Sequence, residues 1–264
     1  MTLRRIFSDT KVILDSFKLN GKIALVTGAS AGLGAAIAIA LAEAGVDVAA
    51  HGNSRAPDAT CRSIELTGRR ALPVLGDLAD KSVPEQLIKQ TLAHFGQLDI
   101  LINNAGTIRR APAVDHSEED WATVIEVNLS SVFRMCQLAG RHMIERGSGK
   151  IVNIASLLSF QGGVTVPGYA ASKGGVAQLT KALANEWAKY GINVNAIAPG
   201  YMRTDNTTAL QADETRNRQI LERIPAGRWG EPQDMAGPAV FLSSAASDYV
   251  HGHVLVVDGG WMGR

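Results

Sequence analysis

The sequence has little cysteine and almost no net charge. Only Cys61 and Cys136 occur among 264 residues, and they form no paired motif. A disulfide framework is therefore not expected, and a reduced, cytoplasmic setting is the default. The formal net charge of +1 gives no electrostatic reason to expect binding to a nucleic acid or a membrane surface.

An uninterrupted apolar run is also lacking at the N-terminus. Asp9, Lys11 and Asp15 break up the apolar residues between positions 1 and 17. The segment is therefore neither a credible signal peptide nor a transmembrane span. We interpret residues 1–17 as a short arm that is partly disordered or packed on a neighbouring subunit.

The rest of the chain contains no long Pro-, Gly- or Ser-rich linker, no composition shift and no internal repeat. Hydrophobic residues make up 46% of the sequence, which is enough for a substantial core. Short apolar runs alternate with helical patterns such as 83–95, 118–145 and 170–190, as is typical of parallel βαβ units. We predict one α/β domain over residues 18–264, a Rossmann-type doubly wound fold with helices on both faces of a parallel sheet. The expected strands are 22–27, 46–50, 71–75, 98–103, 150–155, 193–198 and 254–257.

One segment departs from this alternation. Residues 201–223 are polar, contain a predicted helix at 213–223 and interrupt the last βαβ connection. Insertions at the carboxyl ends of parallel strands border the ligand crevice of such folds. We therefore expect residues 201–223 to form a substrate lid.

A glycine-rich turn, TGASAGLG at 27–34, follows the first predicted strand. Gly28 permits a tight turn, Gly32 lets backbone approach a phosphate, and Gly34 allows close helix packing. The N-terminus of the next helix adds free N–H groups and a positive dipole end for a pyrophosphate. The spacing G-x-x-x-G-x-G differs from the commoner G-x-G-x-x-G, and an ordinary turn is the alternative. The strand before it and the helix after it favour dinucleotide binding, with Ser30 and Leu33 among the contacts.

Two further motifs follow later strands. Asp77 comes after the third strand, where a carboxylate can accept from an adenine amino group, and NNAG at 103–106 ends the fourth. Each is also compatible with a plain turn. The carboxyl ends of neighbouring strands border one crevice, however, which favours a shared cofactor site. The contacts expected from these motifs are Asp77, Leu78, Asn104, Ala105 and Gly106.

The end of the second strand bears on the choice between NAD and NADP. A carboxylate there binds the ribose 2′-hydroxyl and repels a 2′-phosphate, but the segment HGNSR at 51–55 contains no acid. Asn53, Ser54 and Arg55 can accept a 2′-phosphate, although Arg55 is equally compatible with a solvated loop charge. The preference therefore stays open.

Tyr169 and Lys173 stand four residues apart on a predicted helix, and Ser156 follows the fifth strand. One helical turn places the tyrosine and the lysine on the same face. A free phenol has a pKa near ~10, and a nearby ammonium lowers that pKa towards the working range. Ser156 can donate to a substrate oxygen as charge develops on it. This group of residues predicts hydride-transfer chemistry with Tyr169 as the acid/base.

From residue 22 to residue 260 the sequence resembles the short-chain dehydrogenase/reductase family. Besides the motifs above, it resembles the family at Asn128 in Val-Asn-Leu and at Pro199-Gly200 with Thr204. The resemblance implies a catalytic tetrad in which Asn128 holds a water linked to the lysine. It also implies a seven-stranded sheet and a homotetramer built partly from the helices at 118–145 and 170–190. The implied tetrad is Asn128, Ser156, Tyr169 and Lys173, and the further cofactor contacts implied are Tyr169, Lys173, Pro199, Gly200, Met202 and Thr204.

Several stretches resemble a narrower group, the 2-deoxy-D-gluconate 3-dehydrogenases, also described as 2-dehydro-3-deoxy-D-gluconate 5-dehydrogenases. The more specific matches are NNAGTIRR at 103–110 and IASLLSFQGG at 154–163. Wider-spread matches occur at 184–208, 223–230 and 257–261. The resemblance implies reversible oxidation of a secondary alcohol on a deoxy sugar acid, with NAD or NADP.

A sugar-acid substrate needs a cation for its carboxylate. Arg109, Arg110 and Arg203 are the candidates, because guanidinium binds carboxylate in a bidentate manner; solvated or intersubunit charges are the alternative for each. Gln161 can meet a hydroxyl. The substrate-binding set that we predict is Arg109, Ser156, Gln161, Tyr169 and Arg203.

Three other functions are considered. A 3-oxoacyl carrier-protein reductase would share the fold and the tetrad, and so would another sugar or polyol dehydrogenase. A non-catalytic cofactor-binding regulator is disfavoured because all four tetrad positions are intact. No metal site is expected, because His251 and His253 have no evident third ligand.

Overall fold

The computed structural model describes residues 12–264. Most of the predicted arm at 1–17 lies outside the described residues. Its end forms a 3₁₀ turn, Ile13–Phe17, in which the Phe17 ring lies 6.3 Å from that of Phe241. No helix of the described residues is long and apolar enough to cross a membrane.

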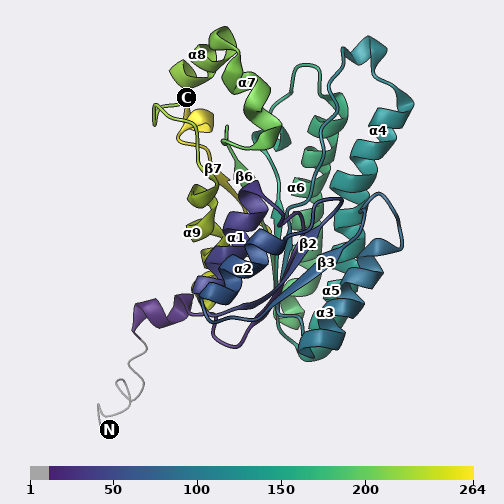
Figure 1. Ribbon diagram of the computed structural model, residues 1–264, viewed down its shortest axis with the longest axis vertical. Helices are drawn as coiled ribbons and strands as arrows, with labels where there is room; N and C mark the ends of the chain where they lie inside the picture. The colour runs from purple at the N-terminus through teal and green to yellow at the C-terminus, as the bar shows by residue number, and fades with distance from the viewer. Residues whose placement is uncertain (1–11) are drawn as a thin grey trace.

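A seven-stranded parallel sheet forms the centre of the molecule, as predicted (Figure 1). The strand order is β3-β2-β1-β4-β5-β6-β7, and it reverses direction between β1 and β4. In doubly wound folds the ligand crevice lies at this reversal, outside the carboxyl ends of the strands. The strands are β1 (Ile23–Val26), β2 (Asp47–Gly52), β3 (Ala71–Leu75), β4 (Ile100–Asn103), β5 (Gly149–Ile154), β6 (Ile192–Pro199) and β7 (Val254–Val257).

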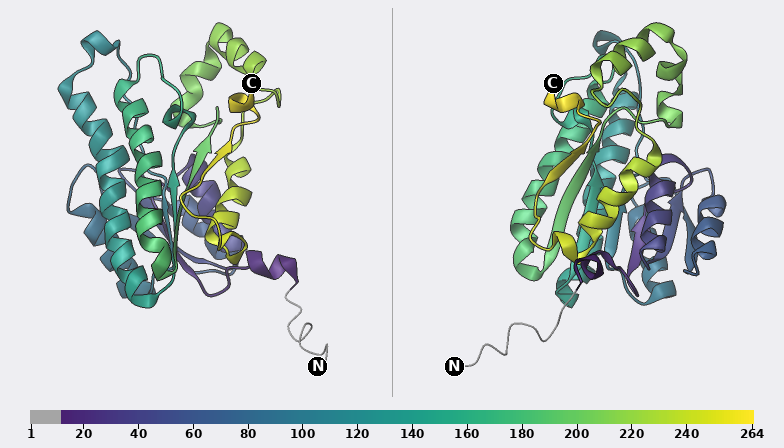
Figure 2. Two further views of the ribbon diagram at one scale, coloured as in Figure 1. Left: turned by 180° about the vertical axis from the view of Figure 1, so that it is seen from behind. Right: turned by 90° about the vertical axis from the view of Figure 1, so that its left-hand side faces the viewer.

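Helices cover both faces of the sheet (Figures 1 and 2). One face carries α1 (Gly32–Glu43), α2 (Asp58–Leu66) and α9 (Ala236–Ser243). The other carries α3 (Val83–Phe95), α4 (Glu118–Ile125), α5 (Ser131–Arg146) and α6 (Pro167–Trp187).

The central strands are buried on both sides, which explains their continuous apolar composition. All four residues of β1, Ile-Ala-Leu-Val, are buried, and so are all eight of β6. Side chains alternate across the sheet, so Leu25 packs with α3 and α5 while Ala24 and Val26 pack with α1. Two apolar clusters of this kind hold the helices against the sheet.

The helix predicted at 118–145 is interrupted. Between α4 and α5 the chain makes a π-helical turn, Glu126–Ser130, which contains the predicted tetrad residue Asn128. Such turns concentrate at functional sites. The predicted helix at 170–190 begins three residues earlier, at Pro167, and its last residues, Ala188–Tyr190, form a 3₁₀ turn.

The segment after β6 contains two short helices, α7 (Thr208–Ala212) and α8 (Glu214–Arg223). Asp213 caps α8 by accepting a hydrogen bond from the Arg216 N–H at 3.0 Å. Both helices lie beyond the carboxyl ends of the strands, close to the C-terminus (Figure 1). This is the place expected for a lid.

Candidate active site

Two cavities adjoin at the carboxyl edge of the sheet. The smaller, about 250 Å³, is bordered by the glycine-rich turn and the β4 loop. The larger, about 440 Å³, is bordered by the loop after β5, by α8 and by Trp261 near the C-terminus. Tyr169 and Asn206 line both cavities. The phenol therefore stands where two bound molecules would meet.

The glycine-rich turn is shaped by backbone that other residues would strain. Gly28 has a φ of 65°, in the left-handed region. A Cβ on Gly34 would overlap the Gly28 carbonyl, so this glycine lets α1 pack directly against the turn. Thr27 and Asn104 join the turn to β4: the Thr27 Oγ1 accepts from the Asn104 N–H at 3.0 Å, and the Asn104 Nδ2 donates to the Gly28 carbonyl at 3.0 Å.

The smaller cavity is lined by many of the residues that the sequence predicts to contact a dinucleotide. Its lining contains the N-terminus of α1, with free N–H groups for a phosphate. The predicted cofactor residues in that lining are Gly28, Gly32, Leu33, Asn104, Ala105, Gly106, Tyr169, Lys173 and Thr204. Asp77 lies just after β3, and its carboxylate accepts from the Ala79 N–H.

Other predicted contacts lie differently. Pro199 and Gly200 line the larger cavity. The side chains of Leu78 and Met202 are buried in the apolar core, which leaves only their backbone to contact a cofactor.

The end of β2 carries a polar, exposed segment. Asn53, Ser54 and Arg55 are all exposed. The Ser30 hydroxyl donates to the Arg55 carbonyl at 2.6 Å, which fixes this segment beside the glycine-rich turn. Residues 48–57, from the second residue of β2 to the start of α2, contain no acidic side chain.

The three side chains predicted to carry the chemistry come from two parts of the fold. Tyr169 and Lys173 lie one turn apart on α6, and Ser156 follows β5. Tyr169 shares a hydrogen bond with Ser156. The Lys173 ammonium donates to the Ile154 carbonyl at 2.6 Å and lies 5.7 Å from the centre of the Tyr169 ring. The predicted grouping is thus formed by α6 packing against the end of β5.

The pKa of Tyr169 shifts in the direction opposite to the predicted one. Burial raises the pKa of the phenol, and the Ser156 hydrogen bond and the charge of Arg110 oppose this only partly. Burial also lowers the pKa of Lys173 to about 8. Desolvation disfavours the charged form of each group. Tyr169 is therefore held as a neutral phenol near pH 7.

Asn128 is fully buried on the π-helical turn. Its Oδ1 accepts from the Thr107 N–H at 2.8 Å, and its Nδ2 donates to the Thr107 carbonyl and to the Ser172 hydroxyl. Asn128 thereby ties the β4 loop to α6 next to Lys173. Its side chain is occupied by these contacts.

Arginines reach the larger cavity from two directions. Arg110 lines it from the β4 loop, and Arg216 and Arg223 line it from α8. Arg110 is one of the carboxylate-binding candidates named from the sequence, whereas Arg216 and Arg223 are not among them. Their spacing offered a signal, because residues 216, 219, 220 and 223 form one helical face and all four line the cavity.

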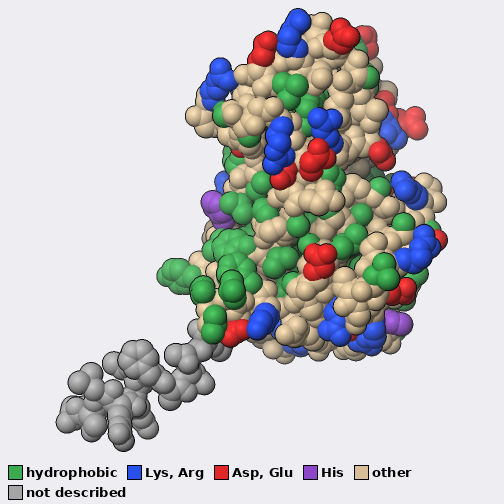
Figure 3. Space-filling view, turned by 60° about the vertical axis from the view of Figure 1, so that its left-hand side comes forward, with side chains coloured by type: hydrophobic (Ala, Val, Ile, Leu, Met, Phe, Trp, Pro, Cys, Tyr) green, Lys and Arg blue, Asp and Glu red, His purple; other side chains and the backbone are tan. Residues whose placement is uncertain are grey.

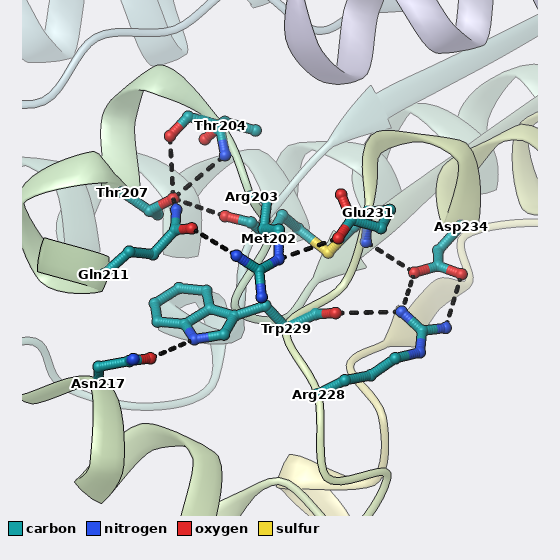
Figure 4. Close-up of polar contacts among 10 residues, drawn as sticks. All are labelled: Met202, Arg203, Thr204, Thr207, Gln211, Asn217, Arg228, Trp229, Glu231 and Asp234. Carbon is teal, nitrogen blue, oxygen red and sulfur yellow. Dashed lines mark hydrogen bonds and ion pairs between the residues drawn. The ribbon is translucent and has the colours of Figure 1, made fainter.

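The two predicted arginines Arg109 and Arg203 are absent from the cavity lining. Arg109 pairs with Asp120 at 3.2 Å. Arg203 pairs with Glu231 at 2.9 Å and donates to the Gln211 Oε1 at 3.2 Å, within a polar network that includes residues of α7 and of the loop before it (Figure 4). The structure therefore commits both guanidinium groups to protein partners.

Gln161, Tyr201 and Trp261 also line the larger cavity. The Trp261 indole N–H donates to the Gln161 Oε1 at 3.2 Å. The Arg223 guanidinium lies 4.1 Å from the centre of a Trp261 ring. Tyr201 and Trp261, whose ring centres lie 4.6 Å apart, form an aromatic side of the cavity that no sequence motif indicated.

The chain matches the family model described as Enoyl-(Acyl carrier protein) reductase over residues 28–262. A 2-dehydro-3-deoxy-D-gluconate 5-dehydrogenase of Dickeya dadantii (strain 3937) is 54% identical over 254 residues, covering 96% of this chain and 100% of the relative. The chain belongs to the short-chain dehydrogenase/reductase family. It is accordingly an oxidoreductase, and its resemblance to the family is confirmed.

Solved structures of short-chain dehydrogenases agree with the fold. An Agrobacterium tumefaciens protein, described as a candidate 2-deoxy-D-gluconate 3-dehydrogenase with bound NADP, is 56% identical, with a TM-score of 0.89 over 95% of this chain and 100% of that one. A gluconate 5-dehydrogenase from Burkholderia cenocepacia J2315, in complex with NADP and tartrate, is 42% identical, with a TM-score of 0.89 over 95% of this chain and 99% of that one. The use of NAD(P) is supported by these relatives.

Proposed function

We propose that this enzyme reversibly oxidises the C5 alcohol of 2-dehydro-3-deoxy-D-gluconate, with NADP as the hydride acceptor. One observation carries the proposal: Tyr169 stands between a dinucleotide cleft and a cavity that contains three arginines. The Dickeya dadantii relative bears the name of this activity.

Tyr169 and Ser156 are the groups that handle the substrate oxygen. When bound, the nicotinamide accepts hydride from the alcohol carbon or returns it to the ketone carbon. In oxidation, the Tyr169 phenolate takes the hydroxyl proton; in reduction, the phenol gives it back. Ser156 donates a hydrogen bond to the oxygen as negative charge develops. Lys173 favours the phenolate by its positive charge.

The arginines supply the site for the substrate carboxylate. The charge of Arg110 acts on the Tyr169 phenol, so we place the carboxylate at Arg110, within electrostatic range of the acid/base. Arg216 and Arg110 both line a small neighbouring recess. A planar guanidinium binds a carboxylate through two parallel hydrogen bonds. A long acyl chain carries no anionic group that could pair with these arginines. The charge in the cavity therefore favours a sugar acid over a carrier-protein thioester.

NADP is the proposed cofactor because nothing at the end of β2 repels a 2′-phosphate. Asn53, Ser54 and Arg55 are exposed there without an acid among them. Ser30 holds the Arg55 backbone at 2.6 Å, so the loop lies against the turn that borders the dinucleotide cleft. The two solved relatives described above contain NADP.

A homotetramer is the proposed assembly, with α5 and α6 in one contact. On that face Phe133 is 44% exposed beside a groove lined by Leu129 and Leu179. A second apolar surface includes Ile13 and Leu14, and Figure 3 shows hydrophobic side chains gathered where the described chain begins. Light scattering on the purified chain measures the assembly.

The cytoplasm remains the proposed location.

Nicotinamide absorbance over time tests the proposed activity. The substrate is 2-dehydro-3-deoxy-D-gluconate or its 5-keto form, each with NAD(H) and with NADP(H), and a β-keto thioester is the comparison. Turnover of the sugar acid, faster with NADP(H), is expected. Turnover of the thioester alone would overturn the substrate, and equal or faster rates with NAD(H) would overturn the cofactor preference.

A further inference from the structure

His51 lies at the end of β2, between two loops of the dinucleotide cleft. Its side chain is almost fully buried, with 1% of the residue exposed. The Gly28 N–H donates to the His51 Nδ1 at 3.2 Å, and the Nε2 lies 2.9 Å from the Gly76 carbonyl. Gly28 begins the turn expected to bind the pyrophosphate, and Gly76 immediately precedes Asp77. One imidazole therefore bridges the loops that follow β1 and β3.

The two partners determine which form of the ring fits. A backbone N–H only donates and a backbone carbonyl only accepts. Nδ1 must therefore carry no proton, and Nε2 must carry one. Protonation of Nδ1 would place two N–H groups against each other at the Gly28 contact. Neutral His51 with its proton on Nε2 is the only form that satisfies both loops.

We propose that His51 is a positioning residue for the cofactor, and that its neutral form holds the Gly28 and Gly76 loops at the spacing that a dinucleotide requires. Acid then weakens cofactor binding, because a protonated ring no longer accepts from Gly28. The effect lies on binding of the nicotinamide dinucleotide and not on the transfer of the substrate proton.

The other contacts to the turn do not titrate. The Asn104 amide donates to the Gly28 carbonyl at 3.0 Å, and the Thr60 hydroxyl donates to the Ala29 carbonyl at 2.7 Å. Neither side chain changes charge between pH 5 and 9. Among these three side-chain contacts, the one made by His51 is the one that depends on pH in this range.

The electrostatic surroundings of His51 act in opposite directions. Burial lowers the pKa of the imidazole, while the Gly76 carbonyl and the Asp77 carboxylate raise it, and the net shift is downward. Within residues 12–264, Asp77 from the β3 loop is the charged group that acts on the ring; the atoms bound to it from the β1 and β3 loops are backbone. The ring is therefore neutral at pH 7, and protonation is expected below pH 6.5.

Cofactor binding across pH tests the proposal. The probe is whichever of NADH and NADPH binds the full-length wild-type protein more tightly at pH 8, titrated by fluorescence between pH 5 and 8.5. The variants are His51→Asn, which keeps a short side-chain acceptor that does not titrate, and His51→Phe, which keeps a ring without hydrogen bonds. Dividing the wild-type dissociation constant by that of His51→Asn at each pH cancels any titration of the probe itself.

The ratio is expected to rise as pH falls from 7 to 5, by up to about 10-fold, the limit set by one lost hydrogen bond. His51→Phe is expected to bind the probe weakly at every pH. A constant ratio, or wild-type affinity in His51→Phe, would overturn the proposal. A purely structural role would lower the melting temperature of the variants without changing this ratio. If neither variant folds, a wild-type dissociation constant that does not rise in acid also overturns it.

Binding of the dinucleotide is measured without any sugar acid. The result is therefore independent of the substrate proposed above, and either proposal can fail while the other stands.

Discussion

The indole N–H of Trp261 donates to the side-chain oxygen of Gln161, 100 residues away in the sequence, at 3.2 Å. Indole offers only a donor, so this contact fixes the orientation of the Gln161 amide. Its NH₂ group remains available for a ligand in the cavity. The substrate atom that meets Gln161 must therefore be an acceptor, such as a carboxylate, hydroxyl or carbonyl oxygen.

Trp261→Phe is expected to raise the KM for the sugar acid by about 2- to 10-fold, because the amide loses the hydrogen bond that orients it. The kcat should change less, since Tyr169 and not the indole is the proposed acid/base. Gln161→Leu should raise the KM similarly, and the double variant should show less than the product of the two effects. If the KM of the double variant rose by the product of the two single effects, Trp261 and Gln161 would act independently and not as one unit.

Arg110 and Arg109 are neighbours in the sequence with different surroundings, which makes them a matched pair. Arg110→Leu is expected to raise the KM for the sugar acid by about 10- to 100-fold, because one charge-assisted contact to the carboxylate is lost. Arg109→Leu removes an exposed pair with Asp120 and exposed hydrogen bonds to Thr107 and Ile108, and it should leave the KM nearly unchanged. Steady-state kinetics with both variants decides which arginine binds the carboxylate. A larger rise of the KM in Arg109→Leu than in Arg110→Leu would assign the carboxylate to Arg109.

Tyr169→Phe removes the phenolic hydroxyl and keeps the ring. The kcat is expected to fall by about 10²- to 10⁴-fold, the usual contribution of general acid–base catalysis. Binding of the reduced cofactor, measured by fluorescence, should change little. Retention of near wild-type kcat would show that another group moves the proton.

The rate of oxidation should depend on pH more steeply than the rate of reduction. The pKa of Tyr169 is raised, so the phenolate that oxidation needs is scarce at pH 7 and grows with pH. Reduction uses the phenol, which already predominates. Above the Lys173 pKa of about 8 the ammonium charge that favours the phenolate is lost, so the rise should flatten. Profiles of kcat/KM in both directions check this; a parallel rise in both would contradict it.

Arg55→Leu should weaken NADPH binding and leave NADH binding nearly unchanged, because only the former carries a 2′-phosphate. The loss is expected to be about 10-fold or more, as for one charge-assisted hydrogen bond. Fluorescence titration with both reduced cofactors measures it. Equal losses with both cofactors would place Arg55 against a group that they share, and no loss with either would assign the guanidinium to solvent.

The sequence was sufficient to predict the sheet and the order of its strands along the chain. Buried parallel strands are continuous apolar runs, so their positions follow from local composition. The grouping of Ser156, Tyr169 and Lys173 was also predictable, since the two α6 residues share a face and Ser156 follows a neighbouring strand. The π-helical turn at Asn128 was not, because the apolar periodicity of the two flanking helices continues through it.

Only the tertiary structure decided where the charged side chains point and how the site is solvated. Arg109 and Arg110 have the same local pattern, yet Asp120 engages the first and the second lines the cavity. The upward shift of the Tyr169 pKa likewise depends on how much protein surrounds the ring, and residue spacing does not contain that quantity. Sequence specifies short-range periodicity and chemistry; burial and long-range partners such as Gln161 and Trp261 arise only when distant segments pack together.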